Sequence, residues 1–318
     1  MDYYQPDIRW EMLYQISCRQ GFEERFVVKG KFHNPVPDDI RNDFEIAERL
    51  MAYSYYCYPM YDEALKKLLG MTEMAVKLRC KQLDISLEYK DGKGEVKSRI
   101  LSQLIDLLLQ KEKNKPLKAE LTKARRIRNI FAHPDRHSFF GGMVYHSITQ
   151  VINTINFIFI EDLVCKDAKT HFDELRELSR IFEHGNFILD YNGNSYLAYG
   201  GKCLEVHQKG DNWIGLWVFY PVITNIMEQV EEHRYAPPFY MALKHVEIEN
   251  NSITGIDIES NSKIKFYSTE KPANLEILAT FRRQLKECQK ANIEMYLHWI
   301  EEEMGKKLVH HRYNYYWS

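Results

Sequence analysis

The sequence predicts an α+β protein in which an N-terminal helical bundle is followed by a smaller β-rich part with a C-terminal helix. Apolar residues recur at helical spacing over most of the first half, whereas hairpin signals and β-branched or aromatic runs dominate after about residue 186. The 318 residues, with an apolar share of 45%, suffice for two domains with their own cores. We therefore expect domains at residues 1–185 and 186–318.

The helical half is divided by proline, glycine and charged turns. Residues 1–36 show no clear period and are expected to pack as a leader, and the polar stretch 88–97 is expected to be a loop. Pro59 and Pro134 each disfavour helix at the preceding residue. The predicted helices are Ile40–Tyr58, Met60–Leu83, Ser98–Gln110, Leu117–His133, Met143–Val164 and His171–Phe182.

Strand signals fill the second half. Asn192-Gly193 predicts a hairpin turn between two short strands, and residues 250–252 predict a second one. Helical spacing returns over Leu275–Gly305. The predicted strands are Phe187–Asp190, Ser195–Tyr199, Trp213–Tyr220, His245–Glu249, Thr254–Glu259 and Ile264–Tyr267.

Two aromatic-rich segments have alternative interpretations. Residues 213–220 either pack in the core, which strands with many aromatic residues normally do, or line a ligand pocket. The terminal stretch His310–Trp317 either docks on the domain or on a partner chain, or stacks on nucleic-acid bases. Core packing and docking are the interpretations we favour.

Composition excludes several classes. A net charge of −2 does not suit a protein that coats nucleic acid nonspecifically, so any such contact needs a local basic patch. The six cysteines form no CxxC pair, which argues against zinc sites and a disulfide framework. The N-terminus lacks the features of a signal peptide, and the longest apolar stretch, Val151–Ile160, is too short to span a bilayer. We expect a cytoplasmic protein without membrane contact.

A basic patch precedes the most informative motif. Between Lys111 and Arg136 there are nine lysines and arginines but three acidic residues, a local charge of +6 on a chain of net −2. Lys123, Arg125 and Arg126 on the predicted helix, with Arg136 after it, are the candidate phosphate contacts. Taken alone, this charge pattern is more typical of a solvated helix face than of a binding site.

The motif itself is Arg128-Asn129-Ile130-Phe131-Ala132-His133. Asn129 and His133 are four residues apart and share one helix face, and the long Arg128 side chain can reach the same edge. Histidine can accept or donate a proton near neutral pH, and arginine can hold a phosphate. Asparagine can orient the histidine ring or a phosphate oxygen. These side chains suit cleavage of a phosphodiester by the RNA's own 2′-hydroxyl, which needs neither a metal nor a cofactor.

This motif resembles the Rx4-6H motif of HEPN domains, in which asparagine commonly follows the arginine. The resemblance covers roughly residues 40–182, and an upstream helix with Glu73 is similar to the acidic helix that faces the motif in that family. It implies a helical bundle that dimerises, so that two motifs form one composite ribonuclease site. Arg128 and His133 would then be catalytic and Asn129 supporting, with Glu73 a possible further support. Residues 186–318 match no family that we recognise.

We therefore expect a metal-independent endoribonuclease of a toxin or phage-defence system. It would act on RNA as a homodimer through its helical domain, and an antitoxin or regulatory protein is a possible partner. The alternative is a non-catalytic HEPN module that binds RNA or protein, with a C-terminal domain that senses a ligand or partner. The RNA target does not follow from the sequence.

Overall fold

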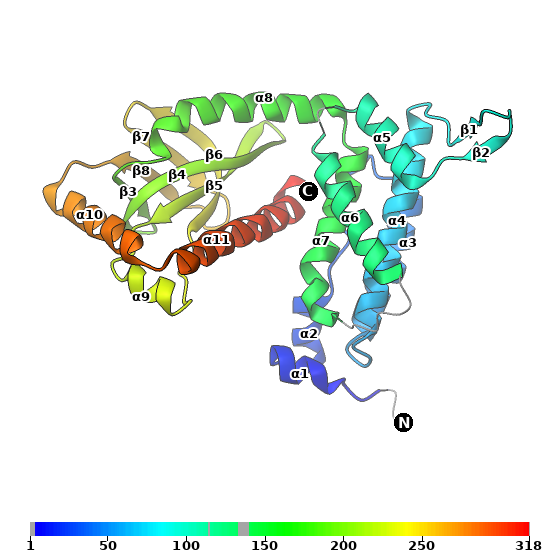
Figure 1. The fold of residues 1–318 in the computed structure, drawn as a ribbon, viewed down its shortest axis with the longest axis horizontal. Helices are drawn as coiled ribbons and strands as arrows, with labels where there is room; N and C mark the ends of the chain where they lie inside the picture. Colours follow the sequence, from blue (N-terminus) through cyan, green and yellow to red (C-terminus); the bar gives the residue numbers. More distant parts are fainter. Residues whose placement is uncertain (1–3, 114, 133–139, 318) are drawn as a thin grey trace. The chain divides into compact units, whose positions relative to one another are not determined.

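A computed structural model describes residues 4–113, 115–132 and 140–317, with the backbone alone for residues 130–132. The predicted mixture of helices and strands is confirmed (Figure 1). The chain forms two compact units. Met1–Lys166 and Arg312–Ser318 make up the helical unit, and Asp167–His311 make up the barrel unit. This division lies earlier than the predicted boundary at 185/186, and the last residues of the chain belong with its first half.

The helical unit is built around α4, which packs against α3, α5, α6 and α7. Its apolar positions recur every three or four residues, and Ala64, Leu65, Leu68 and Ala75 are fully buried. The helices of this unit are α1 (Ile8–Tyr14), α2 (Arg19–Phe26), α3 (Asp38–Tyr53), α4 (Met60–Gln82), α5 (Leu101–Lys111), α6 (Leu117–Ala132) and α7 (Tyr145–Phe159), with a 3-10 turn η1 (Gly141–Val144) before α7.

Two stretches differ from their predictions. The leader packs, as expected, but it also contains two helices that were not predicted, α1 and α2, which bury Trp10, Phe22 and Phe26. The predicted loop at 88–97 instead forms a small antiparallel hairpin of β1 (Glu88–Lys90) and β2 (Val96–Ser98). The two helices and the hairpin are all short, and the hairpin is largely exposed. None of them therefore gives a strong apolar period in the sequence.

The end of the chain docks on α7. After the π-helical turn η3 (Arg312–Tyr316), the buried Trp317 donates its indole N–H to Oδ1 of Asn153 at 2.7 Å. Tyr313 donates its hydroxyl to the carbonyl of Lys29, also at 2.7 Å. Residues 312–317 thus follow the docking interpretation of the terminal stretch, on the helical unit itself.

The barrel unit is a closed meander of six antiparallel strands. Leu189, Trp217, Leu243 and Phe266 are fully buried in its interior cluster, so the aromatic run at 213–220 serves largely as core. The Asn192-Gly193 turn joins the first two strands, as predicted. The strands are β3 (Phe187–Tyr191), β4 (Asn194–Lys209), β5 (Asn212–Pro221), β6 (Phe239–Glu249), β7 (Ser252–Asp257) and β8 (Lys263–Ser268).

Helices accompany the barrel within its unit. α8 (Asp162–Ser179) begins in the helical unit and continues into the barrel unit, followed by the 3-10 turn η2 (Arg180–Phe182). α9 (Ile226–Glu231), α10 (Pro272–Glu287) and α11 (Lys290–His311) share a separate apolar cluster (Figure 1). The predicted Leu275–Gly305 helix is therefore two helices, because Cys288 adopts extended backbone. Ile160 likewise separates α7 from α8 within the predicted Met143–Val164 helix.

Candidate functional site

The helix α6 presents one apolar and one basic face. Leu117, Leu121 and Ala124 are buried at helical spacing, and α6 packs there against α4, α5 and α7. Before the helix, the buried Lys115 donates from Nζ to the carbonyl of Ile158 at 2.9 Å. The buried residues fix the inner face of α6, and Lys115 fixes the chain just before the helix. The outer side chains of α6 therefore project from a rigid helix.

The outer face carries cations without acidic partners. Lys118, Lys123, Arg125 and Arg126 are all exposed. Among the residues that the structure describes, none of the four lies within ion-pair distance of a carboxylate. Within the described residues, solvent and salt offset their charges. This arrangement can attract a phosphate chain although the whole protein is slightly acidic. Arg136, the fifth predicted phosphate contact, lies outside the described residues.

Arg128 differs from these cations because it is held by an acid. Its Nη2 lies 3.0 Å from Oε2 of Glu73 on α4, while Nζ of Lys77 lies 2.8 Å from the other Glu73 oxygen. The hydrogen bond from Lys77, together with the charges of Lys77 and Arg128, lowers the pKa of Glu73 against the opposing effect of burial. Glu73 therefore stays ionised and orients Arg128, while its two cations leave a net charge of +1.

A shallow depression lies beside this ion pair. It is formed between α4, α5 and α6, and its floor is apolar. Arg125 and Arg128, one helical turn apart, supply cationic groups to its lining. The other lining residues are Leu69, Thr72, Glu73, Val76, Leu101, Ile105, Leu121 and Ala124. The helices thus place two guanidinium groups and one carboxylate around a small hollow.

The motif is placed in part. Asn129 is exposed on α6, one residue after Arg128. His133, the predicted proton-transfer residue, lies outside the described residues, as do residues 134–139. The geometry therefore brings together Arg128, Glu73 and Arg125.

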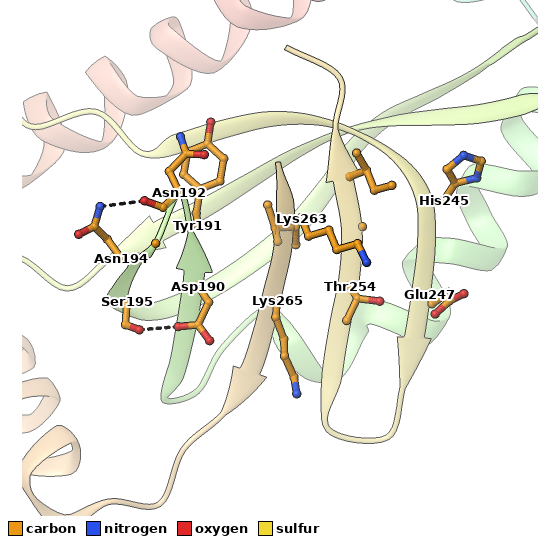
Figure 2. Close-up of a pocket in the computed structure, with 14 residues that line it drawn as sticks. Asp190, Tyr191, Asn192, Asn194, Ser195, His245, Glu247, Thr254, Lys263 and Lys265 are labelled. Carbon is orange, nitrogen blue, oxygen red and sulfur yellow. Dashed lines mark hydrogen bonds between the residues drawn. The ribbon is translucent and has the colours of Figure 1, made fainter. Parts of the chain in front are cut away.

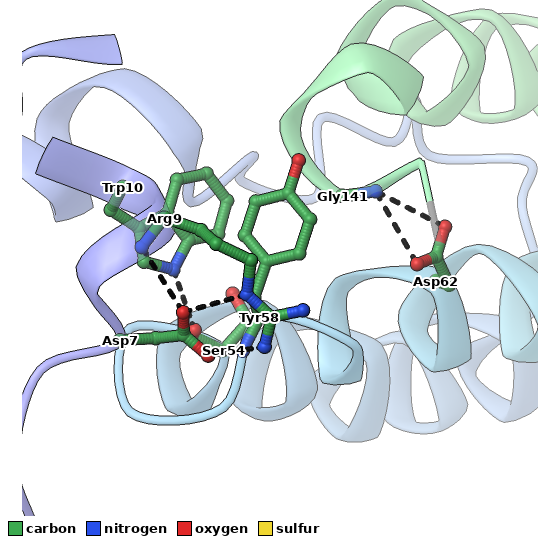
Figure 3. Close-up of polar contacts among 7 residues, drawn as sticks. All are labelled: Asp7, Arg9, Trp10, Ser54, Tyr58, Asp62 and Gly141. Atoms are coloured by element: carbon green, nitrogen blue, oxygen red, sulfur yellow. Dashed lines mark hydrogen bonds and ion pairs between the residues drawn. The ribbon is translucent and has the colours of Figure 1, made fainter. Parts of the chain in front are cut away.

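Phe140 and Gly141, the first described residues after the motif, are anchored by a side chain of α4. Asp62 on α4 is buried and accepts the backbone N–H of Phe140 at 3.2 Å and that of Gly141 at 3.3 Å (Figure 3). Burial raises the pKa of Asp62, and the two amide hydrogen bonds oppose that rise. Gly141 has φ +50°, and a Cβ there would lie 1.8 Å from Cζ of Tyr58. Only glycine fits this close approach.

A second set of contacts holds Tyr58 itself. Its hydroxyl donates to the carbonyl of Phe140 at 3.2 Å, and its backbone N–H donates to Oδ2 of Asp7 at 3.0 Å. Nearby, Trp10 donates from its indole to the carbonyl of Ser54 at 2.7 Å (Figure 3). The N-terminal helices thus hold the turn before α4 in place. Through Tyr58, this turn fixes the chain at Phe140.

Sequence reasoning missed this anchor. A glycine pair before a helix is consistent with the end of a loop, but it also fits close packing against aromatic rings. Asp62 carried no signal, because an aspartate in the first turn of a helix is ordinary. Tyr58 gave none either, since it precedes Pro59 and was assigned to a helix break.

No protein-family model and no curated protein matches this chain. Within residues 4–113, 115–132 and 140–317, no three His, Cys, Asp or Glu side chains are grouped so that they could hold a metal ion. Over the same residues no single helix is long and apolar enough to cross a membrane, although one bent pair, Gly141–Phe159 with Asp162–Phe182, passes by length and composition.

Proposed function

We propose that the helical unit is a HEPN-type, metal-independent endoribonuclease. The observation that supports this most is the basic face of α6, which runs up to an arginine held in place by Glu73. In the sequence, His133 follows Ala132, the last residue of that helix. A phosphate drawn to the exposed cations would thus meet a guanidinium and an imidazole at the same helix end.

Each group has a role in the proposed reaction. Arg128 binds the non-bridging oxygens of the phosphate and offsets the negative charge that grows on them. His133 takes the proton of the ribose 2′-hydroxyl or gives one to the departing 5′-oxygen. The 2′-oxygen bonds to phosphorus as the P–O5′ bond breaks, which leaves a 2′,3′-cyclic phosphate and a 5′-hydroxyl. Unpaired RNA is the expected substrate, since its backbone can turn for in-line attack.

Glu73 is a positioning residue in this scheme. A carboxylate beside a phosphate site would repel the substrate, but here both of its oxygens already face cations, Lys77 and Arg128. The guanidinium has five N–H donors, so Arg128 can keep its bond to Glu73 while it holds a phosphate. Asn129, Arg125, Arg126 and Lys123 then extend the contact along the RNA.

The family resemblance also implies a homodimer with a composite site, and a place in a toxin or phage-defence system with an antitoxin or regulatory partner. A light-scattering mass of twice 37.9 kDa would support the dimer. A mass of one chain at micromolar concentration would contradict it.

The chemistry can be tested on an RNA with one 2′-deoxyribose. Wild-type protein in EDTA should cut an unstructured oligonucleotide and leave 2′,3′-cyclic phosphate ends, and a 2′-deoxy sugar at the cut position should block that cut while its neighbours are still cleaved. Cleavage that continues at the deoxy position, or that produces 5′-phosphate ends, would contradict attack by the 2′-hydroxyl.

A second candidate is a non-catalytic module that binds RNA or protein. It is favoured by the same Glu73–Arg128 contact, since an ion pair between two helices also serves structure alone. In that case His133→Ala would bind RNA or partner as the wild type does and keep the biological activity. Loss of that activity in a folded His133→Ala protein would rule this candidate out.

A further inference from the structure

The barrel unit has a cavity, open to solvent, that the proposed nuclease does not use. Its volume is about 680 Å³, which lies within the range of roughly 300–1,000 Å³ that is typical of small-molecule sites. The β3–β4 hairpin, a short stretch of β6 and the facing parts of β7 and β8 line it (Figure 2).

The pairing of the strands lays a polar row across this cavity. Glu247 lies opposite Thr254, which lies opposite Lys265; Lys265 in turn lies opposite Asp190, and Asp190 opposite Ser195. Directly opposed residues of antiparallel strands project from the same face of a sheet. All five line the cavity. The row passes over the β8–β3 seam that closes the barrel, so residues distant in sequence supply one continuous polar surface.

Two lysines give the cavity its positive charge. Lys263 and Lys265 are two residues apart in β8 and therefore face the same side. Over the described part of the chain, no carboxylate lies within ion-pair distance of either ammonium group. Nζ of Lys265 lies 5.4 Å from the ring centre of Tyr267, and Asp190 is its cross-strand neighbour in the ladder. Two adjacent free ammonium groups are suited to one doubly charged phosphate.

A histidine is aimed at the same cavity by an unusual backbone. His245 lies in the β6–β7 bulge between Lys244 and Glu247 and has φ +51°, a left-handed conformation that non-glycine residues rarely adopt. Bulges often re-aim a side chain near a functional site. Figure 2 shows the imidazole at the β6 side of the cavity, with the side chain of Lys263 extending between β8 and β7.

The acidic groups complement the cations. One oxygen of Asp190 accepts the hydroxyl of Ser195 at 2.5 Å, and the carboxylate also faces the Tyr267 hydroxyl. A carboxylate has further lone pairs that can accept from a ligand. Glu247 at the far end of the row is exposed and has no ion-pair partner among residues of known placement. Carboxylates of this kind accept hydrogen bonds from sugar hydroxyls. The amides of Asn192 and Asn194 add donors and acceptors on the hairpin side.

We propose that this cavity binds a small phosphate monoester of a hydroxylated sugar, either a nucleotide or a sugar phosphate. Lys263 and Lys265 hold the phosphate, His245 adds a donor, and Asp190 and Glu247 accept the sugar hydroxyls. A purely anionic ligand would leave the two carboxylates unfavourably placed, and a neutral sugar would leave the lysines unused. This site lies in the barrel unit and does not depend on the nuclease proposal.

Titration calorimetry on the full-length protein tests the site. The probes are a nucleoside 5′-monophosphate, a hexose 6-phosphate, inorganic phosphate, and the unphosphorylated nucleoside and hexose. One of the two monoesters should bind at least about tenfold more tightly than inorganic phosphate and than its own unphosphorylated form. The better monoester decides between nucleotide and sugar phosphate.

Variants assign the binding to the cavity. The double variant Lys263→Ala/Lys265→Ala should weaken the monoester at least about tenfold, and Asp190→Asn should weaken the monoester more than it weakens inorganic phosphate. Lys286→Ala, an exposed lysine of α10, is the matched control and should bind as the wild type does. Unchanged circular dichroism shows that the variants fold.

Three results would overturn the proposal. One is that no probe binds at millimolar concentration. Another is that the folded double lysine variant binds the monoester as tightly as the wild type. The third is that inorganic phosphate binds as well as both monoesters, because the carboxylates then contribute nothing.

Discussion

The two units satisfy their buried polar groups in different ways. In the barrel unit the strand ladder pairs the backbone, and the interior is filled by apolar side chains such as Leu243 and Phe266. In the helical unit, side chains satisfy many of these groups, since Asn156 on α7 bonds to the backbone of residues 31 and 33, and Glu112 is enclosed with Lys115 and Arg79. The helical unit therefore encloses charged groups together with their partners. The barrel interior is filled chiefly by apolar side chains, although its buried Asp257 accepts the hydroxyl of Ser260.

The largest loss of stability is expected for a substitution of Glu112, in the helical unit. Its Oε1 lies 2.7 Å from Nζ of Lys115, whose side chain is fully buried, and 2.5 Å from Nη2 of Arg79. Glu112→Ala leaves two cations without their acid and should lower the free energy of unfolding by about 3–5 kcal/mol. Asp106→Ala, which removes an exposed acid of the same helix, is the control for urea denaturation. A loss below about 1 kcal/mol would show that the enclosed ions are not coupled.

The matching change in the barrel is Leu243→Ala. Leu243 is fully buried, and its removal should cost about 2–5 kcal/mol through lost burial and the cavity that remains. Adding salt should alter the cost of Glu112→Ala but not that of Leu243→Ala, since only the first involves charge. Leu297→Ala, at an exposed position of α11, should be nearly neutral. Equal salt dependence at both sites would remove the contrast between the units.

A smaller effect is expected at Asp62, which anchors the chain after the motif. Asp62→Ala leaves the amides of Phe140 and Gly141 without their acceptor and should cost about 1–3 kcal/mol. Because burial raises the pKa of Asp62 in the folded state, its ionisation opposes folding. Its contribution should therefore decline as pH rises from about 4 through the folded-state pKa.

Asp62→Asn should remove that decline while it keeps one acceptor oxygen. Unfolding curves between about pH 4 and 7 measure this decline in stability, with Asp39→Asn, at an exposed position, as the control. A wild-type protein whose stability rises steadily over this range because of Asp62 would contradict the assigned direction.

The smallest effect is expected at Glu73. Its pKa shift, and so the pH dependence of its contribution to stability, has the opposite sign to that of Asp62. Its cationic partners lower its pKa, so its stabilising contribution is present above the ordinary pKa of about 4 and is lost as pH falls through the folded-state value. Since the Arg128 partner is half exposed, Glu73→Gln should cost only about 0.2–1 kcal/mol. A loss larger than that of Asp62→Ala would mean that this pair is chiefly structural.

The regular helices follow from the sequence because their apolar stripes are long. α3 to α7 each have apolar residues at helical spacing, and so their existence is predicted although their ends shift. The continuation of β4 was missed, because Gly200-Gly201 suggests a strand end. In the structure both glycines are needed, since a Cβ on Gly200 would meet the carbonyl oxygen of Glu183 and one on Gly201 would meet Phe219.

Long-range pairing explains what sequence reasoning could not predict. The β3–β8 seam and the row through Asp190 and Lys265 join residues far apart in the chain, and no local pattern fixes that register. The same holds for the return of Trp317 to α7. For the candidate site, Arg128 and the nearby acid Glu73 were named from the motif and its context, whereas the Asp62 anchor depends on a contact across residues 62–141.

The most direct test of the central claim is single-turnover cleavage of unstructured RNA in EDTA. We expect the wild type to cleave, and His133→Ala and Arg128→Ala each to be slower by about 100-fold or more while retaining their unfolding midpoints. Arg49→Ala, an exposed arginine of α3, should cleave at the wild-type rate. A wild type that cleaves no RNA, or folded variants that cleave as fast as it does, would contradict a nuclease site at the end of α6.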